Sequence, residues 1–235
     1  MIEPADAGPA EAPGTSHRVK VWDPIVRLSH WSFAVLVPAM WWTAENSEWG
    51  WHRRLGLVLF GIVTLRILWG FIGPRTARFG DFVRGPSSVL AYFRGKLSGG
   101  ARRVGHNPAG GYSVLALLLV MLAQASMGLF AGDPFDGMTG PLRPLVGVMT
   151  ADTITDLHET FFWVIVGFVA LHIVAIVFYE AVQRERLVGA MVTGRRRVPA
   201  GVEGIGGLPW GRALAAVLLA GGFAFWIAQG APPLT

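Results

Sequence analysis

Five long apolar runs divide this chain of 235 residues. Each run is close to the roughly 20 residues that a helix needs to cross the hydrocarbon core of a bilayer. The stretches between the runs are rich in Pro, Gly and charged residues, which is typical of loops. The pattern predicts an all-α integral membrane protein. The runs are at about Ile25–Thr43, His52–Ile72, Gly111–Ala131, Thr155–Tyr179 and Ala213–Gln229.

The remaining segments predict three regions. Residues 1–17 have no hydrophobic periodicity and predict a disordered tail rather than a signal peptide. Residues 18–197 hold the first four runs, and residues 198–235 form a linker and the fifth run. Within the basic loop before the third run, Ser87–Leu97 predicts a short interfacial helix. Arg66, near the end of the second run, is expected to extend its side chain to the membrane interface.

Composition narrows the chemistry that this chain can perform. Hydrophobic residues make up 52% of the chain and charged residues only 15%, which is too little charge for the surface of a soluble domain. The chain has no cysteine, so disulfides, thiolate metal sites and covalent haem attachment are excluded. Any metal cofactor must therefore be held by histidine, and a haem would be non-covalent.

The net charge is +5 at pH 7, and the basic residues are distributed unevenly between the loops. This distribution indicates membrane topology, so no nucleic-acid partner is expected. If the N-terminus is cytoplasmic and each run crosses once, only Arg53, Arg54 and Arg143 of the 20 Lys and Arg residues lie outside. This asymmetry predicts a multi-pass membrane protein with a cytoplasmic N-terminus and a C-terminus on the outer side. Membrane lipid is its first expected partner.

Histidines in the apolar runs fall into two pairs. His158 and His172 are 14 residues apart, which places them on nearly the same helix face and about 21 Å apart along the axis. In the predicted topology, His30 lies at the depth of His172, and His52 lies at the depth of His158. We call His30 and His172 the inner pair, and His52 and His158 the outer pair.

Two imidazoles from facing helices can supply both axial ligands of a haem iron. Such ligation leaves no open position on the iron, which suits electron transfer. The two pairs therefore predict two non-covalent haem groups that form an electron path across the membrane. Candidate contacts for the haem propionates are Arg27 near the inner pair and Arg53 or Arg54 near the outer pair.

Two other uses of these histidines compete with haem ligation. A proton relay would pair them with carboxylates, which are missing from the middles of the first four runs. A zinc or copper site stays open, although the separation of the pairs and the lack of Cys or acidic co-ligands oppose it. His17 is expected to be inert in the tail, and His106 to lie in a turn that starts a helix.

Acidic residues predict how a partner would approach the outer end. Seven acids lie there against three arginines, so the surface would attract a basic redox protein. The seven are Glu45, Glu48, Asp133, Asp136, Asp152, Asp156 and Glu159.

Several motifs resemble those of a known family. Val21-Trp22-Asp23-Pro24 and the following Arg27-Leu28-Ser29-His30-Trp31 are similar to the opening of bacterial cytochrome b561 proteins and of the b-type haem subunits of nickel–iron hydrogenases. The resemblance covers about residues 19–197. Further matching segments are Gly105–Gly111, Gly140–Leu142, Leu157–Glu159, the helix of His172, and Leu187–Gly194.

The resemblance implies a four-helix bundle that holds two b haems, with His30, His52, His158 and His172 as the ligands. Family members pass electrons between a partner at the outer face and the quinone pool. The implied partner is a periplasmic electron-transfer protein such as a c-type cytochrome or a hydrogenase-like subunit. The implied location is the bacterial inner membrane, with the C-terminus in the periplasm. The fifth run is an addition to which no family function transfers.

Two alternative functions remain open from the sequence. One branch of the family oxidises superoxide and reduces ubiquinone, but an acidic outer surface would repel that anion. The other alternative is a haem-free transporter or assembly factor.

Overall fold

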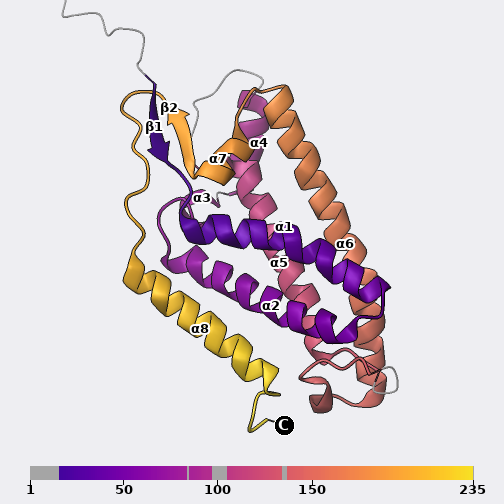
Figure 1. Cartoon of the computed structure of the whole chain (residues 1–235). Coiled ribbons are helices and arrows are strands. Elements are labelled where there is room, and N and C mark those ends of the chain that lie inside the picture. The colour runs from indigo at the N-terminus through magenta and orange to yellow at the C-terminus, as the bar shows by residue number, and fades with distance from the viewer. Residues whose placement is uncertain (1–15, 84, 97–104, 134–136, 235) are drawn as a thin grey trace, which may run out of the picture.

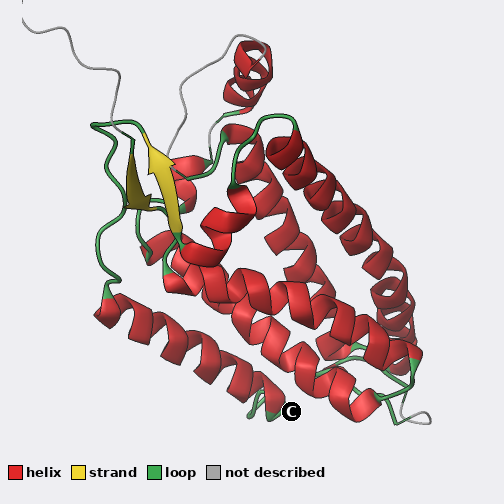
Figure 2. Ribbon diagram, turned by 45° about the horizontal axis from the view of Figure 1, so that its top comes forward, coloured by secondary structure: helices red, strands yellow, loops and turns green. Residues whose placement is uncertain are grey.

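The computed structural model describes residues 16–83, 85–96, 105–133 and 137–234. It is mostly helical, and the prediction of an all-α membrane bundle with an additional C-terminal helix is confirmed (Figures 1 and 2). The long helices are α1 Pro24–Glu45, α2 Trp49–Ile72, α5 Pro108–Phe130, α6 Val148–Ala181 and α8 Trp210–Ala228. The short elements are α3 Phe79–Phe82, α4 Pro86–Lys96, η1 Arg143–Leu145, α7 Leu187–Thr193, and strands β1 His17–Lys20 and β2 Arg195–Val198.

Four helices, α2, α5, α6 and α8, are long and apolar enough to cross a membrane. Helix α1 has 22 residues but is not among these four, whereas the sequence predicted five membrane crossings that included it. Its apolar stretch is interrupted by Arg27 and His30, whose polarity lowers the mean hydropathy. Helix α1 lies along α2 in the antiparallel direction (Figure 1).

The bundle is organised around α2 and α5. Helix α2 packs against α1, α5 and α8, and α5 packs against α6. A buried apolar cluster joins α2, α5 and α6 at mid-height. Its members are Leu59, Val63, Leu118, Met121 and Ile165.

A two-stranded antiparallel ribbon of β1 and β2 closes one end of the bundle, which we call the ribbon end (Figure 2). Residue 17 was expected in a disordered tail, but it is the first residue of β1. The rest of that predicted tail, residues 1–15, lies outside the described residues. The ribbon continues into the core because the N–H groups of Val21 and Trp22 donate to the carbonyl of Gly194, at 2.8 and 3.2 Å.

Two of the long helices begin with the same local chemistry. The Asp23 carboxylate accepts hydrogen bonds from the N–H groups of Ile25 and Val26, and Pro24 stands at the first position of α1. Asn107 caps α5 in the same way, followed by Pro108. His106 therefore directly precedes a helix start, as predicted.

Several element boundaries differ from the expectation: α2, α5 and α8 each start three residues before the predicted run, and α6 and α4 also differ. Helix α6 starts at Val148, seven residues before the predicted run, because the polar residues there are in helical register. The hydroxyls of Thr153 and Thr155 donate to carbonyls four residues earlier, at 2.9 Å. Helix α4 starts at Pro86, and Leu97, the predicted end, lies outside the described residues.

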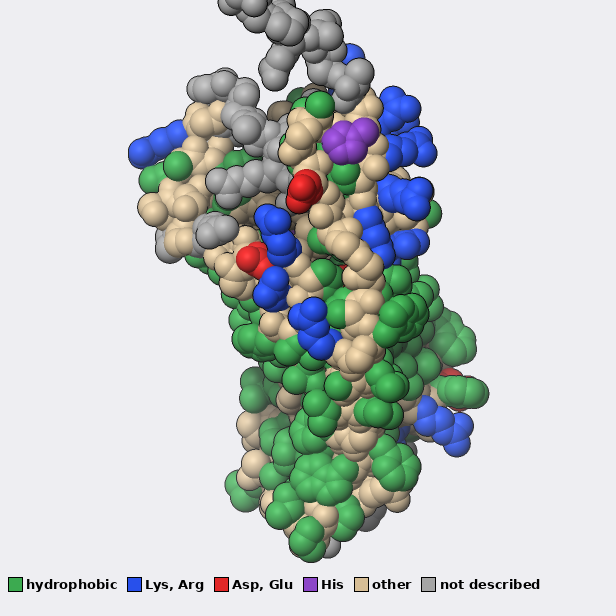
Figure 3. Space-filling view, turned by 90° about the vertical axis from the view of Figure 1, so that its left-hand side faces the viewer, with side chains coloured by type: hydrophobic (Ala, Val, Ile, Leu, Met, Phe, Trp, Pro, Cys, Tyr) green, Lys and Arg blue, Asp and Glu red, His purple; other side chains and the backbone are tan. Residues whose placement is uncertain are grey.

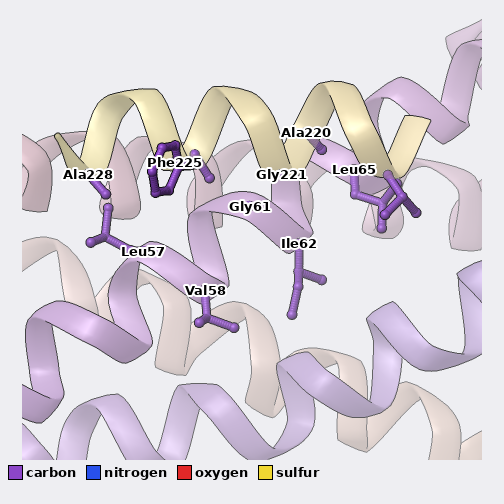
Figure 4. Close-up of a pocket in the computed structure, with 11 residues that line it drawn as sticks. Leu57, Val58, Gly61, Ile62, Leu65, Ala220, Gly221, Phe225 and Ala228 are labelled. Carbon is purple, nitrogen blue, oxygen red and sulfur yellow. The ribbon is translucent and has the colours of Figure 1, made fainter. Parts of the chain in front are cut away.

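Small side chains let α8 lie close to α2. Figure 4 shows Gly61 of α2 and Ala220 and Gly221 of α8 where the two ribbons face each other. A Cβ added at Gly61 would be 3.3 Å from the Cβ of Ala224. The shallow apolar groove between the two helices has a volume of about 360 Å³.

Candidate histidine pair site

The structure brings the four histidines together in the two pairs that depth predicted. The ring centres of the inner pair, His30 on α1 and His172 on α6, are 6.3 Å apart, with an interplanar angle of 56°. The ring centres of the outer pair, His52 on α2 and His158 on α6, are 6.2 Å apart, with an angle of 87°. Helix α6 therefore contributes one ring to each pair.

These separations fit one metal ion between the two rings of each pair. A bond from a metal to an imidazole nitrogen is about 2 Å long, and the ring centre lies about 1 Å behind that nitrogen, so rings on opposite sides of a metal have centres about 6 Å apart. Among the described residues, no group of three or more His, Cys, Asp or Glu could hold a metal ion. Two ligands per site suit a haem iron, because the macrocycle supplies the other four.

Backbone carbonyls orient both rings of the outer pair. His52 Nδ1 donates to the carbonyl of Met40 at 3.0 Å, and the Thr43 hydroxyl lies 3.2 Å from the same nitrogen. His158 Nδ1 donates to the carbonyl of Gln124 at 3.0 Å. Because a carbonyl can only accept, Nδ1 carries the proton in both rings and Nε2 keeps its lone pair. In His158 the Gln124 amide nitrogen Nε2 lies 3.5 Å from that Nε2 atom and can donate to it. This is the tautomer that a metal requires, fixed by the carbonyls that hold Nδ1.

Helix α5 contributes to the outer pair, a role that the sequence reading missed. Gln124 Nε2 donates to the carbonyl of His158 at 2.9 Å. One turn later, a Cβ added at Gly128 would be 3.0 Å from the His158 ring. The position therefore has no room for a side chain. The spacing of Gln124 and Gly128 on one face of an uncharged run was the available signal.

The inner pair lacks this support. His30 Nδ1 is buried and has no hydrogen-bond partner among the described residues. The ring meets Trp31 edge-on, with centres 5.1 Å apart. A buried polar atom without a partner is unusual in a folded protein, and it marks a place where another group belongs.

Arg66 contradicts its expected role at the membrane interface. Its side chain is buried, with 4% of the residue exposed. Nη1 donates to the carbonyl of Ala77 at 3.4 Å, and the guanidinium lies 5.6 Å from the ring centre of Phe79. The prediction was wrong because the segment after α2 folds back over this side chain, which the hydropathy pattern does not show.

His106 is also buried at the ribbon end. Its ring lies between those of Trp22 and Phe82, with centres 4.6 Å from each. Burial, together with the nearby charges of Arg66 and His172, lowers the pKa of His106 to about 3. Its Nδ1 has no partner among the described residues. This imidazole is therefore neutral at physiological pH, and the sequence reading missed its burial.

The three predicted propionate contacts have different surroundings. Arg27 Nε donates to the carbonyl of Met191 at 3.2 Å, and Nη2 donates to the carbonyl of Val192. Its guanidinium therefore satisfies the last carbonyls of α7. Arg53 and Arg54 are exposed beside His52, and Arg54 lies over the ring of Trp51 at 5.4 Å.

Comparison with known proteins gives one family. The family model described as prokaryotic cytochrome b561 matches residues 21–194. Comparisons with curated proteins and with solved structures give no significant match. The matched region contains both histidine pairs and ends at Gly194, so α8 lies beyond it. The chain therefore belongs to the prokaryotic cytochrome b561 family, and it is a membrane-embedded b-type cytochrome of transmembrane electron transfer.

Proposed function

We propose that this protein carries two haem b groups and passes electrons between a periplasmic redox partner and the membrane quinone pool. His52 and His158 hold the outer haem, and His30 and His172 hold the inner one. The observation that carries this proposal is the spacing of the ring centres, 6.2 and 6.3 Å, in two separate pairs that share α6. When bound, each haem supplies a one-electron carrier.

The step along α6 sets the span of the electron path. Fourteen residues of helix between its two histidines correspond to about 21 Å, which is two-thirds of a hydrocarbon core of about 30 Å. Two sites at this separation reach most of the way across a membrane. The low hydropathy of α1 agrees with a helix that turns polar ligands toward the inside of the bundle.

The charge distribution supports an inner-membrane protein with the ribbon end in the cytoplasm. Figure 3 shows Lys and Arg side chains over the ribbon end and hydrophobic side chains over the lower part of this face. Cationic residues concentrate on the cytoplasmic side of bacterial membrane proteins. Helix α8 runs away from the ribbon end, so the C-terminus lies on the periplasmic side (Figure 1).

The acidic residues near the outer pair favour a basic partner. Five of the seven predicted acids are exposed, whereas Asp133 is half-buried and Asp136 lies outside the described residues. A negative surface attracts a positively charged c-type cytochrome or hydrogenase-like subunit and repels superoxide. The exposed acids are Glu45, Glu48, Asp152, Asp156 and Glu159.

Pyridine haemochrome analysis of the purified full-length protein tests the haem content. We expect two b haems per chain. Replacing His30 or His172 by Ala should remove one redox component, and replacing His52 or His158 should remove the other. Helicity by circular dichroism is the control for folding. One haem in the wild type, or loss of both components from every folded variant, would contradict the pairing.

Two further measurements separate the alternatives. A haem-free transporter or assembly factor would show no Soret or α band after purification from haem-replete cells. A superoxide oxidase would consume superoxide catalytically in stopped-flow measurements with quinone present, and we expect no such consumption because the outer surface repels the anion.

A further inference from the structure

Arg66 is the only buried Lys or Arg among the residues that the structure describes. It follows His52 on α2 by 14 residues, so both side chains leave nearly the same face of the helix, about 21 Å apart. His52 belongs to the outer pair, and this spacing places Arg66 toward the depth of the inner pair. A charged side chain inside a membrane bundle is costly and calls for a specific partner.

The described protein groups leave most of this guanidinium unsatisfied. Arginine has five N–H donors. Arg66 makes one hydrogen bond, to the carbonyl of Ala77 at 3.4 Å, and faces the ring of Phe79. The ion pairs within the described residues join other arginines to acids, Arg78 to Asp81 and Arg196 to Glu185. Four of the five N–H donors of Arg66 are therefore left without an acceptor among the described residues, which gives the guanidinium a strong energetic reason to bind an anion.

Asp23 is the acid that interacts with Arg66 electrostatically, and its buried Oδ2 has no hydrogen-bond partner among the described residues. Its Oδ1 accepts from the N–H groups of Ile25 and Val26 and from Trp69 Nε1 at 3.1 Å. It lies beyond the 4.0 Å limit of an ion pair with Arg66. Asp23 therefore offsets part of the charge without filling the hydrogen-bonding positions of the guanidinium.

The register of α1 on α2 places Arg66 next to the inner pair. These antiparallel helices touch through Asp23 with Trp69 and through Met40 with His52. By this register His30 lies beside Ile62, and Arg66 follows one turn later, about 6 Å nearer the ribbon end. His106 is within electrostatic range of both Arg66 and His172, which agrees with this position.

We propose that Arg66 binds a propionate carboxylate of the inner haem. The inference rests on the proposed function, because it requires a haem between His30 and His172. A guanidinium fork matches a carboxylate in two parallel hydrogen bonds, and a buried fork holds it more strongly than an exposed one. Arg27, the sequence-based candidate, already donates to the carbonyls of α7.

Arg66→Gln in the full-length holoprotein tests this assignment. Removing a cation beside the haem favours the oxidised state, so reduction of one haem should become about tenfold less favourable, which is about 59 mV for one electron. The other haem should keep its midpoint potential. Redox-difference infrared spectra of protein loaded with haem that is ¹³C-labelled at the propionate carboxyls should show a shifted carboxylate band.

Arg212→Gln is the matched control. It removes the same charge at the same end of the bundle, where the exposed Arg212 donates to the carbonyl of Ile72 at 3.0 Å. We expect both potentials and the labelled bands to stay as in the wild type. An equal shift in this control would show that the effect of Arg66→Gln is long-range charge rather than carboxylate binding, and would overturn the proposal.

Unchanged inner potential and unchanged carboxylate bands in a folded Arg66→Gln protein would also overturn the proposal. If Arg66→Gln does not retain haem, Arg66→Lys tests the assignment instead. This variant replaces the guanidinium fork by a single ammonium group, so the labelled carboxylate band must shift if residue 66 binds the propionate. A band at the wild-type position would then reject the assignment. Failure of the proposed function appears separately, as a wild-type protein with fewer than two haems.

Discussion

Hydrogen bonding differs between the two histidine pairs, and this difference determines how firmly each pair of rings is held in place. Met40 and Gln124 fix the Nδ1 atoms of the outer pair through their carbonyls, whereas His30 Nδ1 has no partner among the described residues. A ring held by the backbone loses little freedom when it binds a metal, which favours tight binding. The outer pair is therefore the more pre-organised of the two sites.

Gly128→Ala should weaken haem binding at the outer pair alone. The added methyl group would lie 3.0 Å from His158 Cε1, and the ring would have to turn away from its position between α5 and α2. We expect a loss of affinity of about tenfold, as for other changes that misplace a metal ligand. Haem titration of the apoprotein, with two components resolved, measures it. Gly167→Ala on α6 is the control, because a Cβ there meets nothing within 4 Å.

His106 should make the fold sensitive to acid. Its pKa in the folded protein is about 3, below the ordinary value of 6.5, so the unfolded chain binds a proton that the folded chain cannot. The stabilisation is complete above about pH 6.5 and is lost as the pH falls toward 3, by up to about 1.4 kcal/mol per pH unit. His106→Phe keeps the ring contacts and should flatten the pH dependence of the unfolding temperature. An identical slope in both proteins would show that folding leaves the pKa of His106 unchanged, contrary to this expectation.

At the scale of elements, α7 and the ribbon tie the start of the matched domain to its end. Helix α7 ends at Gly194 in the left-handed region, with φ of 74°, and the Gly194 carbonyl accepts from Val21 and Trp22. Arg27 donates to the carbonyls of Met191 and Val192 just before that end. These contacts fix the first residues of α1, and thereby the helix that carries His30.

Gly194→Ala should destabilise this junction. An Ala in the left-handed region costs about 1 kcal/mol, and its Cβ would lie 2.8 Å from the carbonyl oxygen of Trp22. We expect a total loss of about 1 to 3 kcal/mol and faster amide exchange in β1 and β2. Gly189→Ala, within α7 and with no atom within 4 Å of its Cβ, should instead add about 0.5 to 1 kcal/mol. Chemical unfolding in detergent compares the two.

For the molecule as a whole, the exposed acids at the outer end should govern the rate at which a partner docks. Steering by opposite charge raises association rates by about 10- to 1000-fold and weakens with salt. Asp152→Asn combined with Asp156→Asn should slow reduction by a basic c-type cytochrome at low ionic strength, by about tenfold. Stopped-flow rates across a salt series measure this. A wild-type rate that is independent of salt would exclude steering.

The sequence predicts the features of this molecule that depend on local pattern. The apolar runs predict the long helices. The spacing of 14 residues between His158 and His172 predicts the two histidine pairs, because topology and helix geometry determine how deep each histidine lies in the membrane. The burial of Arg66 and His106 was not predictable, since it depends on a segment that folds back over α2. The pairing of β1 with β2 was missed because its residues lie about 175 positions apart.

The ribbon also has a consequence for how the protein is made. Strand β1 leaves the ribosome first, but β2 follows all four haem-binding candidates in the chain. At about 5 to 20 residues per second, roughly 10 to 35 s of synthesis separate the two strands. During that interval β1 has no partner strand, and the junction at the ribbon end stays unformed. His172, the last of the four histidines, precedes β2 by 23 residues, so the inner pair is complete only about 1 to 5 s before β2 is synthesised.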